Sequence, residues 1–392
     1  MRRLNREAYA YTIRDLLGIE SEVVRRFPDD QRAFGFSNNG SVQPASPATT
    51  ALWYDASEEI SRAMVSPNTE AYKRFVSCTP SGVDACARKI VGAFATAAWR
   101  RPATGQEVDD LLALYEKVQE ANAGADALAG LQAAFQGVLL SPHFIFLVEE
   151  TGAEQGRGLS GRELAARLSY LLWSSVPDEE LYEKADSNAL TDPNVLRQQT
   201  ERMLKDPHAT RLVKALASEW LGLQRLRIHQ PDPALFPEFT SDLKADMVKE
   251  TELTLAGWLE DNASVSALLT SDVSYINKRL AAHYGLPTAG DEFKRTNLGG
   301  NRRGILTQGS VLTVTSRVDG TSPVVRGVWV LEDLLCITPP PVPDNVPAIP
   351  EQDRSTKTAR EALETHSVPE TRSGSSRFLC LAPTPKATFR WA

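Results

Sequence analysis

The 392-residue sequence is poor in the residues that build metal and redox sites, with four cysteines and five histidines. The histidines are scattered and form neither H-E-x-x-H nor another short ligand pair, so no local metal site is predicted. The G-x-S-x-G elbow, the P-loop and the G-x-G-x-x-G turn are also missing. The absence of C-x-x-C-H excludes covalent haem attachment through that motif. We therefore assign no catalytic, cofactor-binding or metal-binding residue.

Long hydrophobic runs are missing as well. No uninterrupted run approaches the roughly 18 residues of a membrane-spanning helix, so we expect no transmembrane segment. The N-terminal sequence MRRLNREAYAYTIRDLLG has neither a hydrophobic signal region nor a small-residue cleavage site, so it is not a signal peptide. We expect the chain to start inside a larger precursor. The net charge of −7 argues against nucleic-acid and anionic-membrane partners, because both bind basic surfaces.

What the sequence does contain is regular helical patterning. Hydrophobic residues make up 42% and charged residues 24%, as in a globular protein with a core. Repeated helix starts carry the S/T-x-x-E capping box or an Asp-Pro pair; they are Thr104 with Glu107, Ser160 with Glu163, Asp192 with Pro193, and Asp206 with Pro207. Apolar stripes follow them, so we predict an all-α array of about ten or more helices with long loops and little or no sheet.

Three further segments have their own predicted structures. SYINKRLAAHYG is predicted to be a helix ending at Gly285, whereas GILTQGSVLTVTS suits either a helix or a strand. The loop 27–50 contains three phenylalanines, and we expect it to dock on the core rather than to form a binding edge.

We expect five segments along the chain. They are an N-terminal helical domain (1–66), a small helical domain with two cysteines (67–120), a central helical domain (121–229), a second helical domain ending in a proline-rich linker (230–350), and a disordered or aberrant tail (351–392).

Cys78 and Cys86 are the one pair of cysteines close in sequence. Their spacing fits no zinc pattern, and Pro80, Ser81 and Gly82 supply a turn that could bring the sulfurs together. A disulfide and two unlinked thiols both remain open. A disulfide would contribute about 2–3 kcal/mol on the chain-entropy model and would indicate an oxidising compartment.

The remaining polar candidates have ordinary structural explanations. His143, in the SPHF sequence at a helix break, is expected to be a buried, hydrogen-bonded histidine rather than a ligand or base. His283 lies in the last turn of a helix, where a cation suits the helix dipole. Most tryptophans accompany apolar stripes and are expected in the core rather than on a sugar-binding platform; these are Trp99, Trp173, Trp220, Trp258 and Trp329.

Six blocks of sequence resemble one family. The blocks are LNREAYAYTIRDLLG, the FPDD…GFSNNG loop, AWRRPATGQEVDDLLALY, LLSPHFIFLVE, LSGRELAARLSYLLWSSVPDEEL, and RGILTQGSV…ITPPPVPDNVP. Together they resemble, over about residues 2–350, the planctomycete and myxobacterial cytochrome-c-associated proteins of unknown function with PSD- and PSCyt-type domains.

This resemblance implies an extracytoplasmic location, in the periplasm or at the cell surface, and thereby favours a disulfide between Cys78 and Cys86. Family members often carry a C-x-x-C-H motif after the proline-rich linker. Here ETHSVPETRSGSSRFLCLAPTPKATFRWA follows instead, with Cys380 alone, so we expect a truncated or frame-shifted C-terminus. Haem c is thus possible in full-length relatives, and we expect no cofactor in this chain.

The function expected from the sequence is that of an exported scaffold or electron-transfer partner of cytochrome-type or other exported proteins, without catalysis. The alternative is a secreted enzyme acting on a polymer or glycan. Its cleft would lie near SPHF and the TSRVDGTSPVVRG loop, and carboxylates would serve as acid and base.

Overall fold

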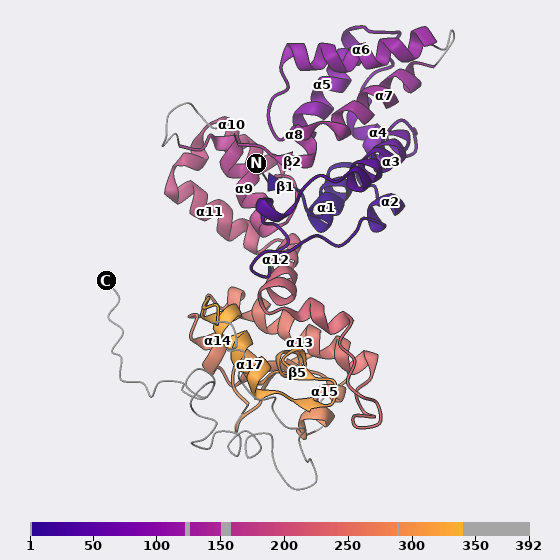
Figure 1. The fold of residues 1–392 in the computed structure, drawn as a ribbon. Helices are drawn as coiled ribbons and strands as arrows, with labels where there is room; N and C mark the ends of the chain where they lie inside the picture. The colour runs from indigo at the N-terminus through magenta and orange to yellow at the C-terminus, as the bar shows by residue number, and fades with distance from the viewer. Residues whose placement is uncertain (1, 122–125, 150–157, 288–289, 301, 340–392) are drawn as a thin grey trace. The chain divides into compact units, whose positions relative to one another are not determined.

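A computed structural model describes residues 2–121, 126–149, 158–287, 290–300 and 302–339 (Figure 1). The chain divides into two compact units, one ending at Leu212 and the other beginning at Val213. The five segments expected from the sequence stay a prediction. The expected tail, 351–392, and Cys380 lie outside the described residues.

The first unit consists of helices joined by loops and one short strand pair. Its α-helices are α1 (Arg6–Leu17), α2 (Glu22–Arg25), α3 (Pro47–Met64), α4 (Glu70–Phe75), α5 (Ala85–Trp99), α6 (Gly105–Ala121), α7 (Ala127–Leu140), α8 (Pro142–Ile145), α9 (Gly161–Leu172), α10 (Glu179–Asp186), α11 (Pro193–Leu204) and α12 (Thr210–Ala215), the last of which continues into the second unit. Strand β1 (Arg2–Arg3) pairs antiparallel with β2 (Phe146–Leu147). Short 3₁₀ turns occur at Gly40–Val42, Ala189–Thr191 and Pro207–Ala209.

Helices α5, α6 and α7 pack against one another, and α3 packs against α7 (Figure 1). Their apolar faces form the main core of this unit, in which Phe94, Tyr115 and Phe135 are fully buried. Phe94 lies between Phe75 and Phe135 in edge-on ring contacts with centroid distances of 5.2 and 5.1 Å. A smaller core lies among α9, α10 and α11 and includes Trp173.

The second unit is built around one long helix, α13 (Ser241–Glu260), which packs against a hairpin and three shorter helices. The hairpin pairs β3 (Val273–Ile276) with β4 (Lys294–Asn297), so that Val273 is opposite Asn297. The other elements are a π-helical turn (Leu216–Trp220), a 3₁₀ helix (Leu223–Arg227), α14 (Ala267–Thr270), α15 (Lys278–Tyr284), a 3₁₀ turn (Ile305–Thr307), α16 (Gly309–Val314), strands β5 (Ser316–Arg317) and β6 (Gly320–Thr321), α17 (Pro323–Trp329) and a π-helical turn (Val330–Leu334).

The predicted all-α class is confirmed, because only short strand pairs accompany the helices of the described residues. The predicted caps form as well. Ser160 and Glu163 make a reciprocal capping box at the start of α9, and Asp192 caps α11 with Pro193 in its first turn. Each cap satisfies a backbone N–H group that the first helical turn leaves without a partner.

Two elements differ from the sequence prediction. SYINKRLAAHYG is not helical throughout, because Val273–Ile276 form strand β3 and Asn277 caps a shorter helix by accepting a hydrogen bond from Leu280 N–H. The ambiguous segment GILTQGSVLTVTS forms a 3₁₀ turn followed by the helix α16.

The expectation for the loop 27–50 holds in part, since Ser37 and Gln43 are buried as well as Phe27. Phe27 is 5% exposed and packs against Tyr9, with ring centroids 5.3 Å apart. Phe34 is 92% exposed, so docking of the whole loop is wrong.

Candidate functional site

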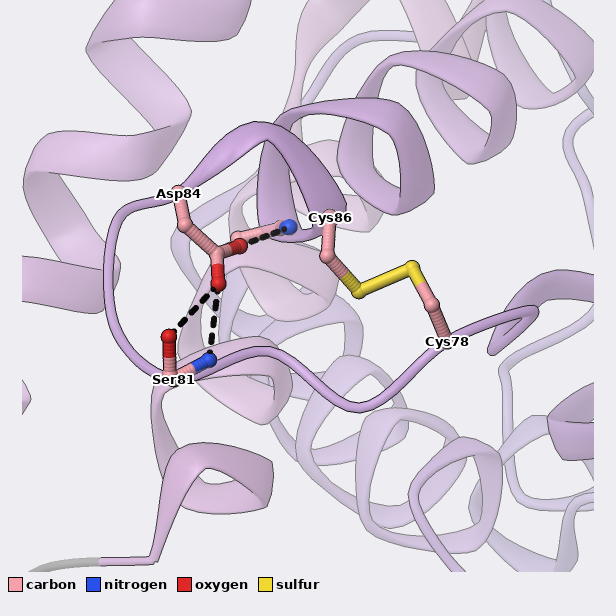
Figure 2. The surroundings of a disulfide bond; sticks show 5 residues. Cys78, Ser81, Asp84 and Cys86 are labelled. Atoms are coloured by element: carbon pink, nitrogen blue, oxygen red, sulfur yellow. Dashed lines mark hydrogen bonds between the residues drawn. A yellow bond between two sulfur atoms is a disulfide. The ribbon is translucent and has the colours of Figure 1, made fainter.

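The two cysteines singled out from the sequence lie together at the start of α5 (Figure 2). Cys78 and Cys86 form a disulfide bond with an Sγ–Sγ distance of 2.05 Å and a Cα–Cα distance of 6.0 Å. Asp84 caps the helix between them: its carboxylate accepts hydrogen bonds from Ala87 N–H, at 2.8 Å, and from the N–H and hydroxyl of Ser81, each at 2.9 Å. These hydrogen bonds lower the pKa of Asp84 to about 2, because they favour the charged form.

The disulfide closes a short loop between Cys78 and Cys86, eight positions apart in the sequence, at the start of α5. Both cysteines are partly buried and pack against the main core of that unit. The disulfide therefore restrains the chain at the start of α5, where this helix packs against the core. These cysteines do not fit a c-type haem, because their sulfurs are bonded to each other, and Cys336 is the one free cysteine of the described residues.

His143 is not the buried histidine that the sequence predicted. Its side chain is 36% exposed, lies against Trp99 with a centroid distance of 5.5 Å, and places Nε2 3.7 Å from Glu107. Partial burial and the nearby Arg101 lower the pKa of His143, which favours the neutral ring. In the second unit, desolvation and a nearby arginine lower the pKa of His283 as well, so a cation at that helix end is not favoured.

Arg100, which was not among the residues predicted from the sequence, stabilises the SPHF turn. Arg100 adopts a left-handed backbone conformation at the end of α5 (φ 60°), and the residue is 5% exposed. Its guanidinium donates hydrogen bonds to the carbonyls of His143, Phe144 and Phe146 at 2.5, 3.0 and 2.9 Å, and to the hydroxyl of Tyr170 at 3.1 Å. Arg100 thus satisfies the carbonyls that the break after α7 leaves without helical partners.

The carboxylate nearest to SPHF is poorly suited to act as an acid. Glu107 accepts two hydrogen bonds from Arg101, at 2.5 and 3.0 Å, and one from Thr104 N–H at 2.8 Å. These partners lower the pKa of Glu107 to about 2. It therefore stays ionised near neutral pH, where its role is to cap α6.

A different carboxyl group, that of Glu250, lies in an environment that raises its pKa instead of lowering it. Glu250, on α13 in the second unit, is 0% exposed. Its Oε2 accepts a hydrogen bond from the Tyr284 hydroxyl at 2.5 Å, and its Oε1 accepts one from the Ser274 hydroxyl at 2.7 Å. Burial raises the pKa of Glu250 to about 7, although the two hydroxyl donors favour the charged form. This carboxyl group therefore changes its protonation state near neutral pH.

Further polar side chains extend the cluster around Glu250. Gln308 donates from Nε2 to Thr254 Oγ1 at 2.8 Å and to Ser274 Oγ at 3.2 Å. Its Oε1 accepts a hydrogen bond from Thr251 at 2.7 Å, and the hydroxyls of Thr251 and Ser310 are 2.6 Å apart. We refer to Glu250, Thr251, Thr254, Ser274, Tyr284, Gln308 and Ser310 as the Glu250 cluster. It joins α13, β3, α15 and α16 through buried hydrogen bonds.

On one side of the Glu250 cluster, Tyr284 contacts the guanidinium of Arg302. The Tyr284 hydroxyl accepts a hydrogen bond from Gly309 N–H at 2.7 Å while it donates to Glu250. The Arg302 guanidinium lies over the Tyr284 ring, 3.9 Å from its centroid. Burial raises the pKa of Tyr284, so the hydroxyl keeps its proton and remains the donor to Glu250. The arrangement can hold and release one proton near neutral pH, and a carboxyl group with such a pKa can act as an acid or a base.

No sequence motif marks this cluster, although the sequence contains one signal of it. Glu250 falls three residues after Met247 and next to Thr251, on the buried face of α13. A glutamate on an apolar stripe is unusual, because an isolated buried carboxylate is costly.

Within the described ranges, no group of three or more His, Cys, Asp or Glu side chains could hold a metal ion. Among the helices of the described part of the chain, none is both long and apolar enough to cross a membrane.

Four family models match the sequence, each described as a protein of unknown function: PSD3 (DUF1587) at residues 2–66, PSD5 (DUF1595) at 86–149, PSD4 (DUF1592) at 159–286 and PSCyt3 (DUF1588) at 302–374. The last match runs past residue 350, where the resemblance was expected to end. No curated protein and no solved structure matches the chain. In their order along this helical chain, the four matches show that it belongs to the planctomycete cytochrome-c-associated proteins with PSD and PSCyt domains, whose function is unknown.

Proposed function

We propose that the protein is an exported, non-catalytic helical scaffold or electron-transfer partner in a cytochrome-c-associated assembly. The observation that carries this proposal is the disulfide between Cys78 and Cys86 at the start of α5. Disulfides persist in oxidising compartments and are rare in the cytosol, so a structural disulfide supports a location in the periplasm or at the cell surface.

In this proposal, any haem is bound by the partner protein and not by this chain. The cysteines of the described residues do not form a haem-attachment pair, so in this proposal electrons pass through a bound cytochrome-type protein.

The experiment that tests the location is peptide mass spectrometry on fractions of the native host. The expected result is that the protein is found outside the cytoplasm, with the Cys78 and Cys86 peptides joined until a reductant is added. A cytoplasmic protein with free thiols at both positions would refute export. A Cys78→Ser/Cys86→Ser variant is the matched control for assigning the joined peptides.

The partner role has a separate test. The native protein is purified under mild conditions, and haem absorbance of the eluted complex is measured before and after dissociation. The proposal expects haem on a co-eluting polypeptide and none on this chain. Haem covalently bound to this chain, or no haem in the complex, would contradict it.

The second candidate function is an enzyme that acts on a polymer or glycan, and one observation favours it. Glu250 has a pKa of about 7, which lies in the range that suits a general acid, although the residue is 0% exposed and would have to be uncovered for a substrate to reach it. Glu107 beside SPHF, by contrast, has a pKa of about 2. Polysaccharide hydrolysis by the wild type that is lost in Glu250→Gln would support the enzyme; no hydrolysis by the wild type across a panel of polysaccharides would argue against it.

A further inference from the structure

The long helix α13 ends at an exposed turn in the second unit. Asn262 has a positive φ angle of 45°, and the N–H groups of Asn262 and Ala263 donate to the carbonyls of Leu259 and Trp258, each at 3.1 Å. These two hydrogen bonds close the helix end, where asparagine tolerates the left-handed conformation. The indole N–H of Trp258 also donates to the carbonyl of Ser264 at 3.0 Å, so the turn is fixed against the helix.

The backbone of this turn explains the asparagine, but it makes no use of the side chain. Asn262 and Ser264 are both exposed. Within the described ranges of the chain, the Asn262 carboxamide has no hydrogen-bond partner. The Ser264 hydroxyl lies 2.9 Å from that of Ser266, which is exposed as well. The amide nitrogen and the Ser264 hydroxyl are therefore open to an enzyme.

The turn has the acceptor sequence for an N-linked sugar chain. Asn262, Ala263 and Ser264 form an N-x-S/T tripeptide whose middle residue is not proline. Glu260 lies two positions before Asn262. An acidic residue there completes the longer motif D/E-x-N-x-S/T that bacterial transferases use. Because a sugar chain is bulky, such a motif counts only on a surface loop, and this turn is one.

The chain contains one other tripeptide of this kind, in a different setting. It consists of Asn39, Gly40 and Ser41, and Ser37 lies two positions before Asn39. Asn39 is half-buried, and its Oδ1 accepts hydrogen bonds from the N–H and the hydroxyl of Ser41, at 3.0 and 2.8 Å. Its carboxamide and the serine hydroxyl thus bind each other, and the acidic residue is missing. Asn39 is therefore an internal control.

Exposed apolar side chains follow the turn of α13. Val265 is 71% exposed, and Leu269 on α14 is 44% exposed. Apolar surface in contact with water is unfavourable. A sugar chain attached to Asn262, three positions before Val265, would shield this surface with its C–H groups.

We propose that Asn262 is the attachment site of an N-linked sugar chain. The inference rests on the proposed export, because the transferases that read this motif act outside the cytoplasm. The donor is an oligosaccharide joined through pyrophosphate to a polyisoprenyl lipid. The Asn262 amide nitrogen loses a proton to a base of the transferase and forms a bond to the anomeric carbon of the first sugar. The bond from that carbon to the pyrophosphate oxygen breaks, and the oxygen keeps the electron pair, so no oxidant or reductant is needed.

Peptide mass spectrometry of the protein isolated from its native host tests this proposal. Trypsin cleaves after Lys249 and Lys278, so Asn262 falls in the peptide 250–278. The expected result is a form of this peptide that is heavier by a whole number of sugar units, with fragment ions that place the added mass on Asn262. The peptide that contains Asn39 is expected only in its unmodified form.

Variants expressed in the same host separate the acceptor motif from the fold. Asn262→Asp keeps the size of the side chain and tolerates the left-handed backbone, but it lacks the amide nitrogen, so the heavier form should be lost. Ser264→Ala should also abolish it, whereas Ser264→Thr keeps the hydroxyl and should retain it. Glu260→Gln should lower the modified fraction. Asn39→Asp is the matched control and should leave the peptide 250–278 as in the wild type.

The state of the disulfide distinguishes a failure of this inference from a failure of the proposed function. A protein found outside the cytoplasm, with Cys78 and Cys86 joined and the peptide 250–278 unmodified, overturns this inference alone. A cytoplasmic protein with free thiols refutes export and the sugar site together. A heavier peptide that persists in both Asn262→Asp and Ser264→Ala also overturns the inference, because the added mass then lies on another residue.

Discussion

The raised pKa of Glu250 makes the stability of the second unit dependent on pH. The folded carboxyl has a pKa of about 7, against 4.5 for the ordinary group. Below pH 4.5 the group is protonated in both the folded and the unfolded state and has no effect. As the pH rises towards 7, the unfolded chain releases this proton more readily than the folded one, so the folded state loses stability.

The size of this effect follows from the difference between the two pKa values. Each pKa unit corresponds to 1.36 kcal/mol, so the difference of about 2.5 units gives a loss of about 3 kcal/mol between pH 4.5 and pH 8. Glu250 is fully buried, so solvent screening does not reduce the effect. His229 and His283 have lowered pKa values and act in the opposite direction, since their unfolded states bind protons more readily.

The comparison with Glu250→Gln isolates the contribution of Glu250 from that of the histidines. Urea unfolding, followed by tryptophan fluorescence, is measured at pH 5 and pH 8 for both proteins. We expect the wild type to lose about 2.5 kcal/mol more than Glu250→Gln over this interval, because part of the effect already appears below pH 5. Glu260→Gln, at the exposed end of the same helix, is the control and should behave like the wild type. Equal pH dependence in the wild type and Glu250→Gln would refute the reasoning.

Three further predictions concern the first unit, and the midpoint of urea unfolding checks each of them. Cys78→Ser/Cys86→Ser should destabilise the unit by about 2–3 kcal/mol, because an open loop has more conformations in the unfolded chain, and added reductant should then have no further effect. Arg100→Leu should cost about 2–4 kcal/mol, since buried carbonyls lose their donors; a change below 1 kcal/mol would contradict the role of Arg100 at the SPHF turn. Gly130→Ala should cost about 1–3 kcal/mol, because the added methyl group would lie 2.7 Å from the Tyr115 ring in a filled core, whereas Gly105→Ala, with open space around it, is the control.

Local sequence signals predicted several helix starts correctly. The capping box at Ser160 and the Asp-Pro start at Asp192 form as expected, and α1 ends at Gly18 in the left-handed conformation. These signals act over three or four residues, so the sequence alone contains the whole interaction. The family was recognisable for a related reason, because its motifs recur in the same order along the chain.

The site depended on contacts between distant residues. Glu250 meets Ser274 and Tyr284, 24 and 34 positions later, and Gln308 reaches the same cluster from the position just before α16. No local pattern fixes which side chains surround a buried carboxyl, so its pKa could not be predicted. The strand at Val273–Ile276 was missed for the same reason, since its partner lies beyond α15.

The sequence by itself thus determined the helical class, the caps, the family and the pair of cysteines able to bond. Tertiary structure decided that Glu250 titrates near neutral pH, that Arg100 holds the SPHF turn and that Phe34 faces solvent. The physical reason is that helix formation and capping are settled within one or two turns of chain. Burial and electrostatic environment are instead properties of the neighbours that folding brings together from far along the sequence.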